Sequence, residues 1–89
     1  MIEKQLEIIN KLGLHARAAS KLVKLASRFE SDITIAKGER KASGKSIMGV
    51  MMLAASRGSV VALEVSGADE ELAAEEIEKL IGDRFGEAE

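Results

Sequence analysis

Apolar residues alternate with polar residues along three stretches of the chain, with the period of two that is typical of β-strands. These stretches are KQLEIIN, SDITIAK and VVALEVS, at residues 4–10, 31–37 and 60–66. The segment GERKAS, residues 38–43, predicts a turn at Gly38 followed by a short polar strand at a sheet edge. Because the alternating strands each have one apolar face, the pattern favours an antiparallel sheet with one face exposed to solvent.

Three other stretches repeat apolar residues at helical intervals. The first covers residues 16–29, and its apolar stripe consists of Ala19, Leu22, Val23, Ala26 and Phe29. The second follows Ser46 in IMGVMMLAAS and ends before Gly58. The third covers about residues 69–81, where Asp69 is a candidate N-cap and the acidic first turn suits the helix dipole.

The predicted elements follow one another in the order β-α-β-β-α-β-α. This order indicates an α+β domain in which three helices cover one face of a four-stranded antiparallel sheet. No linker and no long internal repeat divides the chain, so we expect a single domain over residues 1–89. We expect the final GEAE, residues 86–89, to be a frayed tail.

The size and composition of the chain narrow the classes of function. Eighty-nine residues suit one small domain without a large enclosed active site. The chain has no cysteine, which excludes disulfides and thiolate metal sites. Its start lacks the apolar run of a signal peptide, and no segment approaches the ~20 apolar residues of a membrane span. We therefore expect a soluble, cytoplasmic protein that is not inserted in a membrane and carries no metal or cofactor.

The charges of the chain are unevenly distributed, although the net charge is only -2. The basic residues of the first third are Lys11, Arg17, Lys21, Lys24 and Arg28. Residues 69–89 are strongly acidic, and the only aromatic residues are two phenylalanines, which offer no stacking platform for single-stranded nucleic acid. A basic patch on an acidic chain favours an acidic protein partner or a phosphate group over a nucleic-acid duplex.

The single histidine lies in IINKLGLHARAASKLV, residues 8–23, between the first predicted strand and the first predicted helix. Gly13 permits a tight turn just before it. His15 then falls at or beside the N-cap, where unpaired N–H groups and the helix dipole favour negative charge. Arg17, on the first turn, has a guanidinium suited to phosphate oxygens. This pattern is compatible with a role in which His15 accepts a phosphoryl group and holds it as a phosphoramidate.

Other interpretations of His15 stay open on these residues alone. A simple helix cap fits at least equally well, because polar residues are ordinary at helix starts. A metal site lacks a second histidine or a cysteine. A catalytic triad lacks an identifiable nucleophile that pairs with this histidine.

A second candidate segment is ASGKSIMGVMMLAAS, residues 42–56. Its GKS does not belong to a P-loop, because Glu39 stands where that motif requires glycine. Ser46 is a good N-cap candidate for the apolar helix that follows. If Val50 and Leu53 face the sheet, the other apolar residues of this helix lie near the surface. The alternative is a helix that is buried more deeply in the domain. These residues form a candidate docking patch: Ile47, Met48, Met51 and Met52.

The stretches GLHARAASKLV and GKSIMGVMMLAASRGS, residues 13–23 and 44–59, together resemble the HPr family of histidine-containing phosphocarriers in the bacterial phosphotransferase system. The resemblance covers essentially the whole chain and implies an open-faced β-sandwich. It implies that enzyme I phosphorylates His15 on a ring nitrogen and that an enzyme IIA-type protein receives the group. It also implies that Arg17 assists at the phosphohistidine, and that Ser46 matches the serine modified by HPr kinase/phosphorylase.

The sequence departs from the sugar-transport pattern after the arginine. Sugar-transport members of the family carry proline there, whereas this chain has Ala18. The stretches HARAA and MMLAASRG are closer to the nitrogen-branch paralogues, and GKSIMGVM is compatible with regulatory HPr as well. The branch therefore stays open between sugar transport and nitrogen regulation.

We expect an acidic partner to dock on a surface around His15 and the exposed apolar helix. Its expected residues are Ala16, Arg17, Ser20, Lys21, Lys24, Ile47, Met48, Met51 and Met52. A carrier that presents one histidine to two partners in turn is most simply a monomer. Two alternatives are a regulatory protein that binds through this surface without phosphoryl transfer, and a small nucleic-acid-binding domain, against which the acidic C-terminal region weighs.

Overall fold

The computed structural model describes residues 1–88 and contains the predicted elements in the predicted order. A short 3₁₀ turn, η1, follows the last helix. The elements are β1 (Ile2–Glu7), α1 (Ala16–Ala26), β2 (Asp32–Lys37), β3 (Arg40–Ser43), α2 (Ile47–Met52), β4 (Val60–Ser66), α3 (Glu70–Gly82) and η1 (Arg84–Gly86).

The four strands form one antiparallel sheet in the order β1-β4-β2-β3. Strand β4 is central, and its residue Leu63 pairs with Lys4 of β1 and Ile35 of β2. The alternation along β4 places Val61, Leu63 and Val65 on the buried face. Strand β3 is the polar edge strand that the sequence predicts, and its charged side chains suit an exposed edge.

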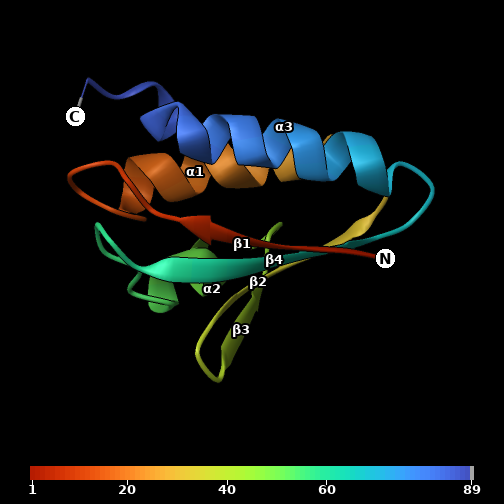
Figure 1. Ribbon diagram of the computed structural model, residues 1–89, viewed down its shortest axis with the longest axis horizontal. Helices are drawn as coiled ribbons and strands as arrows, with labels where there is room; N and C mark the ends of the chain where they lie inside the picture. The colour runs from red at the N-terminus through yellow and green to blue at the C-terminus, as the bar shows by residue number, and fades with distance from the viewer. Residues whose placement is uncertain (89) are drawn as a thin grey trace.

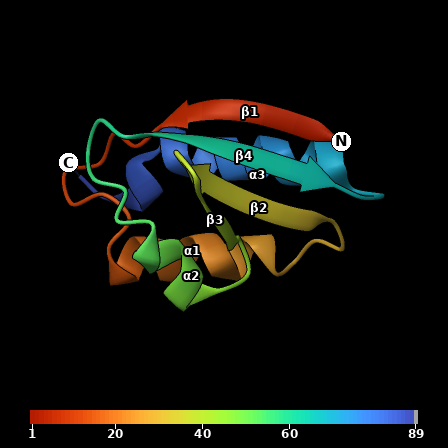
Figure 2. The ribbon, with the colours of Figure 1, turned by 90° about the horizontal axis from the view of Figure 1, so that it is seen from below.

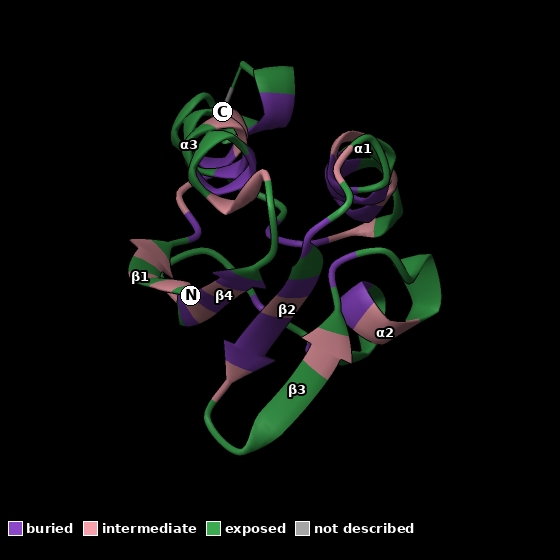
Figure 3. Cartoon of the chain, turned by 90° about the vertical axis from the view of Figure 1, so that its right-hand side faces the viewer, coloured by how far each residue is buried: buried purple, intermediate pink, exposed green. Residues whose placement is uncertain are grey.

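The helices cover one face of this sheet, which confirms the predicted open-faced arrangement. Figure 1 shows α1 and α3 side by side above the strands. Helix α2 lies beside α1, next to β3, as seen from below in Figure 2 and from the side in Figure 3. The segment that follows η1, residues 87–88, lies near the turn that leads into α1 (Figure 1).

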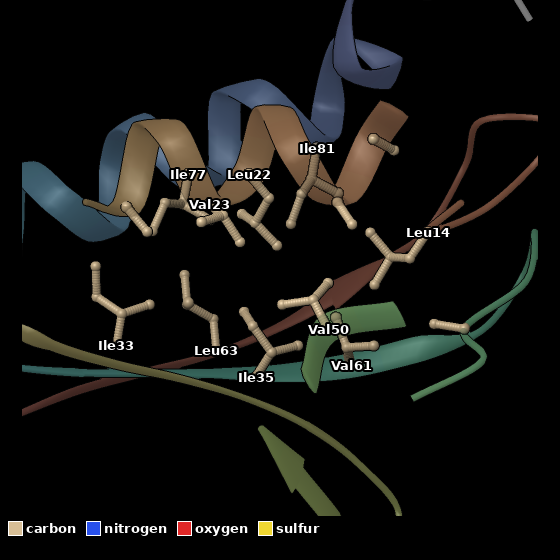
Figure 4. Close-up of a cluster of buried hydrophobic side chains, with 14 of the residues drawn as sticks. Leu14, Leu22, Val23, Ile33, Ile35, Val50, Val61, Leu63, Ile77 and Ile81 are labelled. Atoms are coloured by element: carbon tan, nitrogen blue, oxygen red, sulfur yellow. The ribbon is translucent and has the colours of Figure 1, made fainter. Parts of the chain in front are cut away.

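The core lies between the sheet and the helices, and Figure 4 shows both sides of it. Ile35 and Leu63 point from the sheet toward Leu22 of α1 and Ile77 of α3 (Figure 4). All four side chains are almost completely buried. Val50 of α2 joins the same cluster, so burial of apolar surface holds all three helices to the sheet.

Two helices end earlier than the apolar pattern predicts. Helix α1 ends at Ala26, and the chain then tightens into a turn in which the Phe29 N–H donates to the Ala26 carbonyl oxygen at 3.1 Å. Helix α2 ends at Met52, because Ala54 adopts a left-handed φ of 53° that stops the helix.

Asp69 occupies the N-cap position of α3, as predicted, but its carboxylate is used elsewhere. Its side chain makes no cap hydrogen bond to α3, and its carboxylate instead accepts from the Glu30 N–H at 2.9 Å and the Ser31 N–H at 3.0 Å. The Ser31 hydroxyl donates to the same carboxylate at 2.5 Å. The Ser31 hydroxyl and then the Glu30 N–H hold the pKa of Asp69 below its ordinary value. These tertiary partners therefore replace the local cap.

Within residues 1–88, no helix is long and apolar enough to cross a membrane.

Candidate functional site

The loop that carries His15 is fixed against the segment between α2 and β4. Gly13 has a φ of +66°, and a Cβ at this position would collide with the Ala55 backbone. The next N–H, of Leu14, donates to the Ala55 carbonyl oxygen at 2.8 Å. The Leu14 side chain is buried in the core. This anchoring sets the point at which α1 begins.

His15 is the N-cap of α1, with extended backbone angles. Its Nδ1 accepts a hydrogen bond from the Arg17 N–H at 3.3 Å. Its Nε2 lies 2.5 Å from Oε2 of Glu87. Because Nδ1 accepts and Nε2 faces a carboxylate, this hydrogen-bond pattern assigns the ring proton to Nε2. The imidazole therefore caps the helix and also presents a nitrogen lone pair at its N-terminus.

A buried asparagine holds the Glu87 carboxylate in place. The Asn10 side-chain amide donates to Oε1 of Glu87 at 2.9 Å and to the Gly13 carbonyl oxygen at 2.8 Å. Asn10 is completely buried. The amide of Asn10 and then the imidazole of His15 hold the pKa of Glu87 below its ordinary value, so this carboxylate is ionised at neutral pH.

The prediction of a frayed tail is wrong for Gly86 and Glu87, and residue 89 lies outside the described part of the chain. Phe85 is completely buried in the core. Its carbonyl oxygen accepts a hydrogen bond from the Lys21 ammonium at 2.6 Å. Arg84 and Phe85 both adopt a φ of 55°, which turns the chain back from α3 toward α1. Packing of Phe85 and the bonds to Glu87 thus order the tail.

An open cleft surrounds His15 at this end of the molecule. Its lining consists of Lys11, Leu12, His15, Ala16, Arg17, Lys21, Gly86, Glu87 and Ala88. The predicted residues Ala16, Arg17 and Lys21 therefore meet His15 at one site. Ser20 is half-buried, Lys24 is exposed, and neither lines the cleft.

The apolar helix α2 presents a separate surface beside α1. Ser46 is exposed, and its hydroxyl oxygen accepts from the Gly49 N–H at 3.1 Å, which confirms the predicted cap. Val50 and Leu53 are buried, as the pattern predicts. The four remaining apolar side chains are exposed, and we name them the α2 patch: Ile47, Met48, Met51 and Met52. Helix α2 packs against α1 (Figure 2), so this patch lies next to the surface of α1.

Two polar side chains of the site, Asn10 and Glu87, were missed by sequence reasoning. They lie 77 positions apart in the sequence, and no local motif joins them. The acidic character of the C-terminal region was visible, yet it did not indicate which carboxylate reaches the histidine.

Fold and site together define a small open-faced α+β domain that presents one histidine at the start of a helix. The family model described as "PTS HPr component phosphorylation site" matches residues 2–83. Phosphocarrier protein HPr of Neisseria meningitidis is 51% identical over 89 residues, with 100% of both chains covered. Phosphocarrier protein NPr of Shewanella violacea is 47% identical over 87 residues, covering 98% of this chain and 96% of the relative.

A solved structure supports the same assignment. The crystal structure of HPr from Thermoanaerobacter tengcongensis superposes with a TM-score of 0.96 at 47% identity, with 100% of both chains covered. The chain belongs to the HPr family of the phosphotransferase system. Its function is that of a phosphocarrier, and its partners are enzymes of that system.

Proposed function

We propose that His15 is the phosphoryl acceptor, that phospho-enzyme I is the donor and that an enzyme IIA-type protein receives the group. One observation carries this proposal: Nδ1 of His15 faces the Arg17 N–H at the N-terminus of an 11-residue helix. A phosphoryl group on this nitrogen lies where the helix dipole and unpaired N–H groups favour negative charge. This setting supports formation of the phosphohistidine and its later transfer.

Atoms and electrons balance in the phosphoryl transfer when only the donor, His15 and the acceptor take part. Nδ1 gives up the hydrogen bond that it accepts from the Arg17 N–H, and its lone pair attacks phosphorus and forms the N–P bond. The bond between phosphorus and the donor breaks and leaves its electron pair on the donor. Nε2 keeps its proton, so the ring becomes positively charged as the phosphoryl group arrives. The second transfer reverses these roles, and His15 recovers its lone pair.

Arg17 supplies the cation that meets the phosphoryl oxygens. It lines the same cleft as His15, and its side chain is exposed to solvent. A planar guanidinium binds two oxygens of a phosphoryl group at once, whereas an ammonium acts as a point charge. We assign to Arg17 the stabilisation of charge on the phosphoryl group during both transfers.

The docking surface combines charge with apolar area. Exposed cations on α1 attract acidic partners, and the α2 patch beside them supplies apolar contact. Met48 and Met52 are about 70% exposed, and their flexible side chains suit successive partners of different shape. The surface includes Ala16, Arg17, Ser20, Lys21, Lys24, Ile47, Met48, Met51 and Met52. Such a contact is modest in area, which permits rapid release of each partner.

Phosphorylation of Ser46 by an HPr kinase/phosphorylase is the regulatory part of the proposal. The modification would place a charge of about -2 beside the α2 patch, at a helix N-terminus that accepts it locally. We expect it to repel acidic enzyme I without unfolding the domain. In an assay of transfer from phospho-enzyme I, Ser46→Asp should be slower than Ser46→Asn, whose uncharged side chain has the same shape and is also able to cap α2. Equal rates for the two variants would contradict this mechanism.

The acceptor assignment is tested by intact-mass analysis with phosphoenolpyruvate, magnesium and enzyme I proteins of the sugar and nitrogen branches. We expect one acid-labile phosphate on the wild type and none on His15→Ala, with the faster donor identifying the branch. We also place this monomeric carrier in the cytoplasm, where both partners act. Absence of phosphate with active donors would overturn the assignment and favour a regulator that binds without transfer.

A further inference from the structure

Within residues 1–88, the carboxylate of Glu87 is the one negative group that directly contacts the acceptor ring. We propose that Glu87 is a positioning residue of the phosphotransfer site: it holds His15 in the Nε2–H tautomer and stabilises the ring's positive charge during phosphorylation of Nδ1. The C-terminal segment, residues 84–88, then belongs to the site. This inference rests on the proposed function of His15 as the acceptor.

The contacts of the ring leave one productive arrangement. Nε2 lies 2.5 Å from Oε2 of Glu87 and therefore carries the ring proton and donates a hydrogen bond to that carboxylate. Nδ1 lies on the opposite side of the ring and faces the Arg17 N–H. Without the carboxylate, only the long 3.3 Å hydrogen bond from the Arg17 N–H to Nδ1 favours a proton on Nε2, and the form protonated at Nδ1 has no lone pair there. Glu87 thus selects the form in which Nδ1 attacks.

Both oxygens of the Glu87 carboxylate are engaged, which fixes its orientation. Oε2 contacts His15, and Oε1 accepts from the buried amide of Asn10. Asn10 also donates to the Gly13 carbonyl oxygen in the turn before His15. One side chain therefore links the tail to the loop that carries the acceptor.

Two contacts outside the carboxylate bring the tail to this position. Phe85 is completely buried, and Lys21 donates from α1 to the Phe85 carbonyl oxygen at 2.6 Å. The left-handed backbone at Arg84 and Phe85 reverses the chain direction after α3. Glu87, two positions after Phe85, consequently reaches His15 at the N-terminus of α1.

The charge balance of the transfer gives the carboxylate its role. Attack by a neutral imidazole leaves a phosphorylated ring that carries a proton on Nε2 and a positive charge. An adjacent carboxylate stabilises an imidazolium that forms during reaction, as the aspartate does in a Ser-His-Asp triad. The arriving phosphoryl group lies at Nδ1, on the far side of the ring from Glu87, where Arg17 and the helix N-terminus accept its negative charge.

The test compares Glu87→Gln and Glu87→Ala with Glu71→Gln, a matched loss of one exposed carboxylate at the opposite end of α3. Nitrogen-15 NMR of the ring reports the tautomer, and rapid-quench kinetics report transfer from phospho-enzyme I. We expect the alanine variant to populate both tautomers and the glutamine variant to lose charge stabilisation. Each should transfer about 10- to 100-fold more slowly, by analogy with the loss when a metal-binding histidine is deprived of the carboxylate that orients it.

The two proposals fail in distinguishable ways. If the wild type takes up no phosphate, the proposed function of His15 fails. If wild type takes up phosphate while both Glu87 variants keep the Nε2–H tautomer and the rate of Glu71→Gln, the role of Glu87 is overturned. Urea unfolding of each variant shows whether it is folded, and the tautomer readout stays decisive because loss of stability alone does not move a ring proton.

Discussion

Replacement of Phe85 by alanine tests whether the C-terminal segment is part of the folded core. The phenyl ring is completely buried, and truncation of a buried phenylalanine to alanine costs about 3–5 kcal/mol. With a urea slope of about 1 kcal/mol per M, the low end for a small domain, the unfolding midpoint should fall by roughly 3 M or more. Such a loss is a large part of the stability of a domain of this size.

Far-UV circular dichroism is the suitable probe, because the chain has no tryptophan or tyrosine for fluorescence. Phe85→Leu keeps most of the side-chain volume and should cost about 1 kcal/mol, which keeps the measurement possible if the alanine variant is unfolded. Leu72→Ala, on an exposed position of α3, is the control and should change stability by less than about 0.5 kcal/mol. If Phe85→Ala matched this control, the tail would be an independent appendage and the placement of Glu87 would lose its support.

Three further predictions concern the site and the fold around it. Arg17→Lys should slow transfer from phospho-enzyme I while leaving the urea midpoint unchanged, because an ammonium loses bidentate contact with the phosphoryl oxygens. Gly13→Ala should destabilise the domain by about 1–3 kcal/mol in urea unfolding, since alanine is strained at a φ of +66°. Asp69→Asn should lower stability at neutral pH, because an amide nitrogen replaces one of the two carboxylate oxygens that accept hydrogen bonds from the Glu30 and Ser31 N–H groups. The pKa of Asp69 is lower in the folded state than its ordinary value. The ionised carboxylate therefore stabilises the fold fully at pH values above the ordinary pKa, and this stabilisation is lost as the pH falls through the lowered pKa. Urea midpoints measured from neutral to acid pH should therefore converge for wild type and Asp69→Asn, and a constant difference would refute this reasoning.

The local features of this protein are determined by its sequence. Alternation with a period of two placed the strands, and helical spacing placed α1 and its buried stripe, because backbone hydrogen bonding imposes these periods on neighbouring residues. The same locality placed His15 and Arg17 together, since they are two residues apart at a helix start. The exposure of four apolar residues on α2 was also predictable, because a short helix on a sheet buries only one face and α2 is apolar around most of its circumference.

Tertiary structure decided which distant groups meet. Glu87 reaches His15 across 72 positions of sequence only because Phe85 packs into the core and turns the chain back. Asp69 stands where a cap is expected, yet its carboxylate binds Ser31, 38 positions away. No periodicity encodes such pairs, because they depend on how the helices pack on the sheet. The histidine was therefore visible in the sequence, and its carboxylate partner became visible only in the fold.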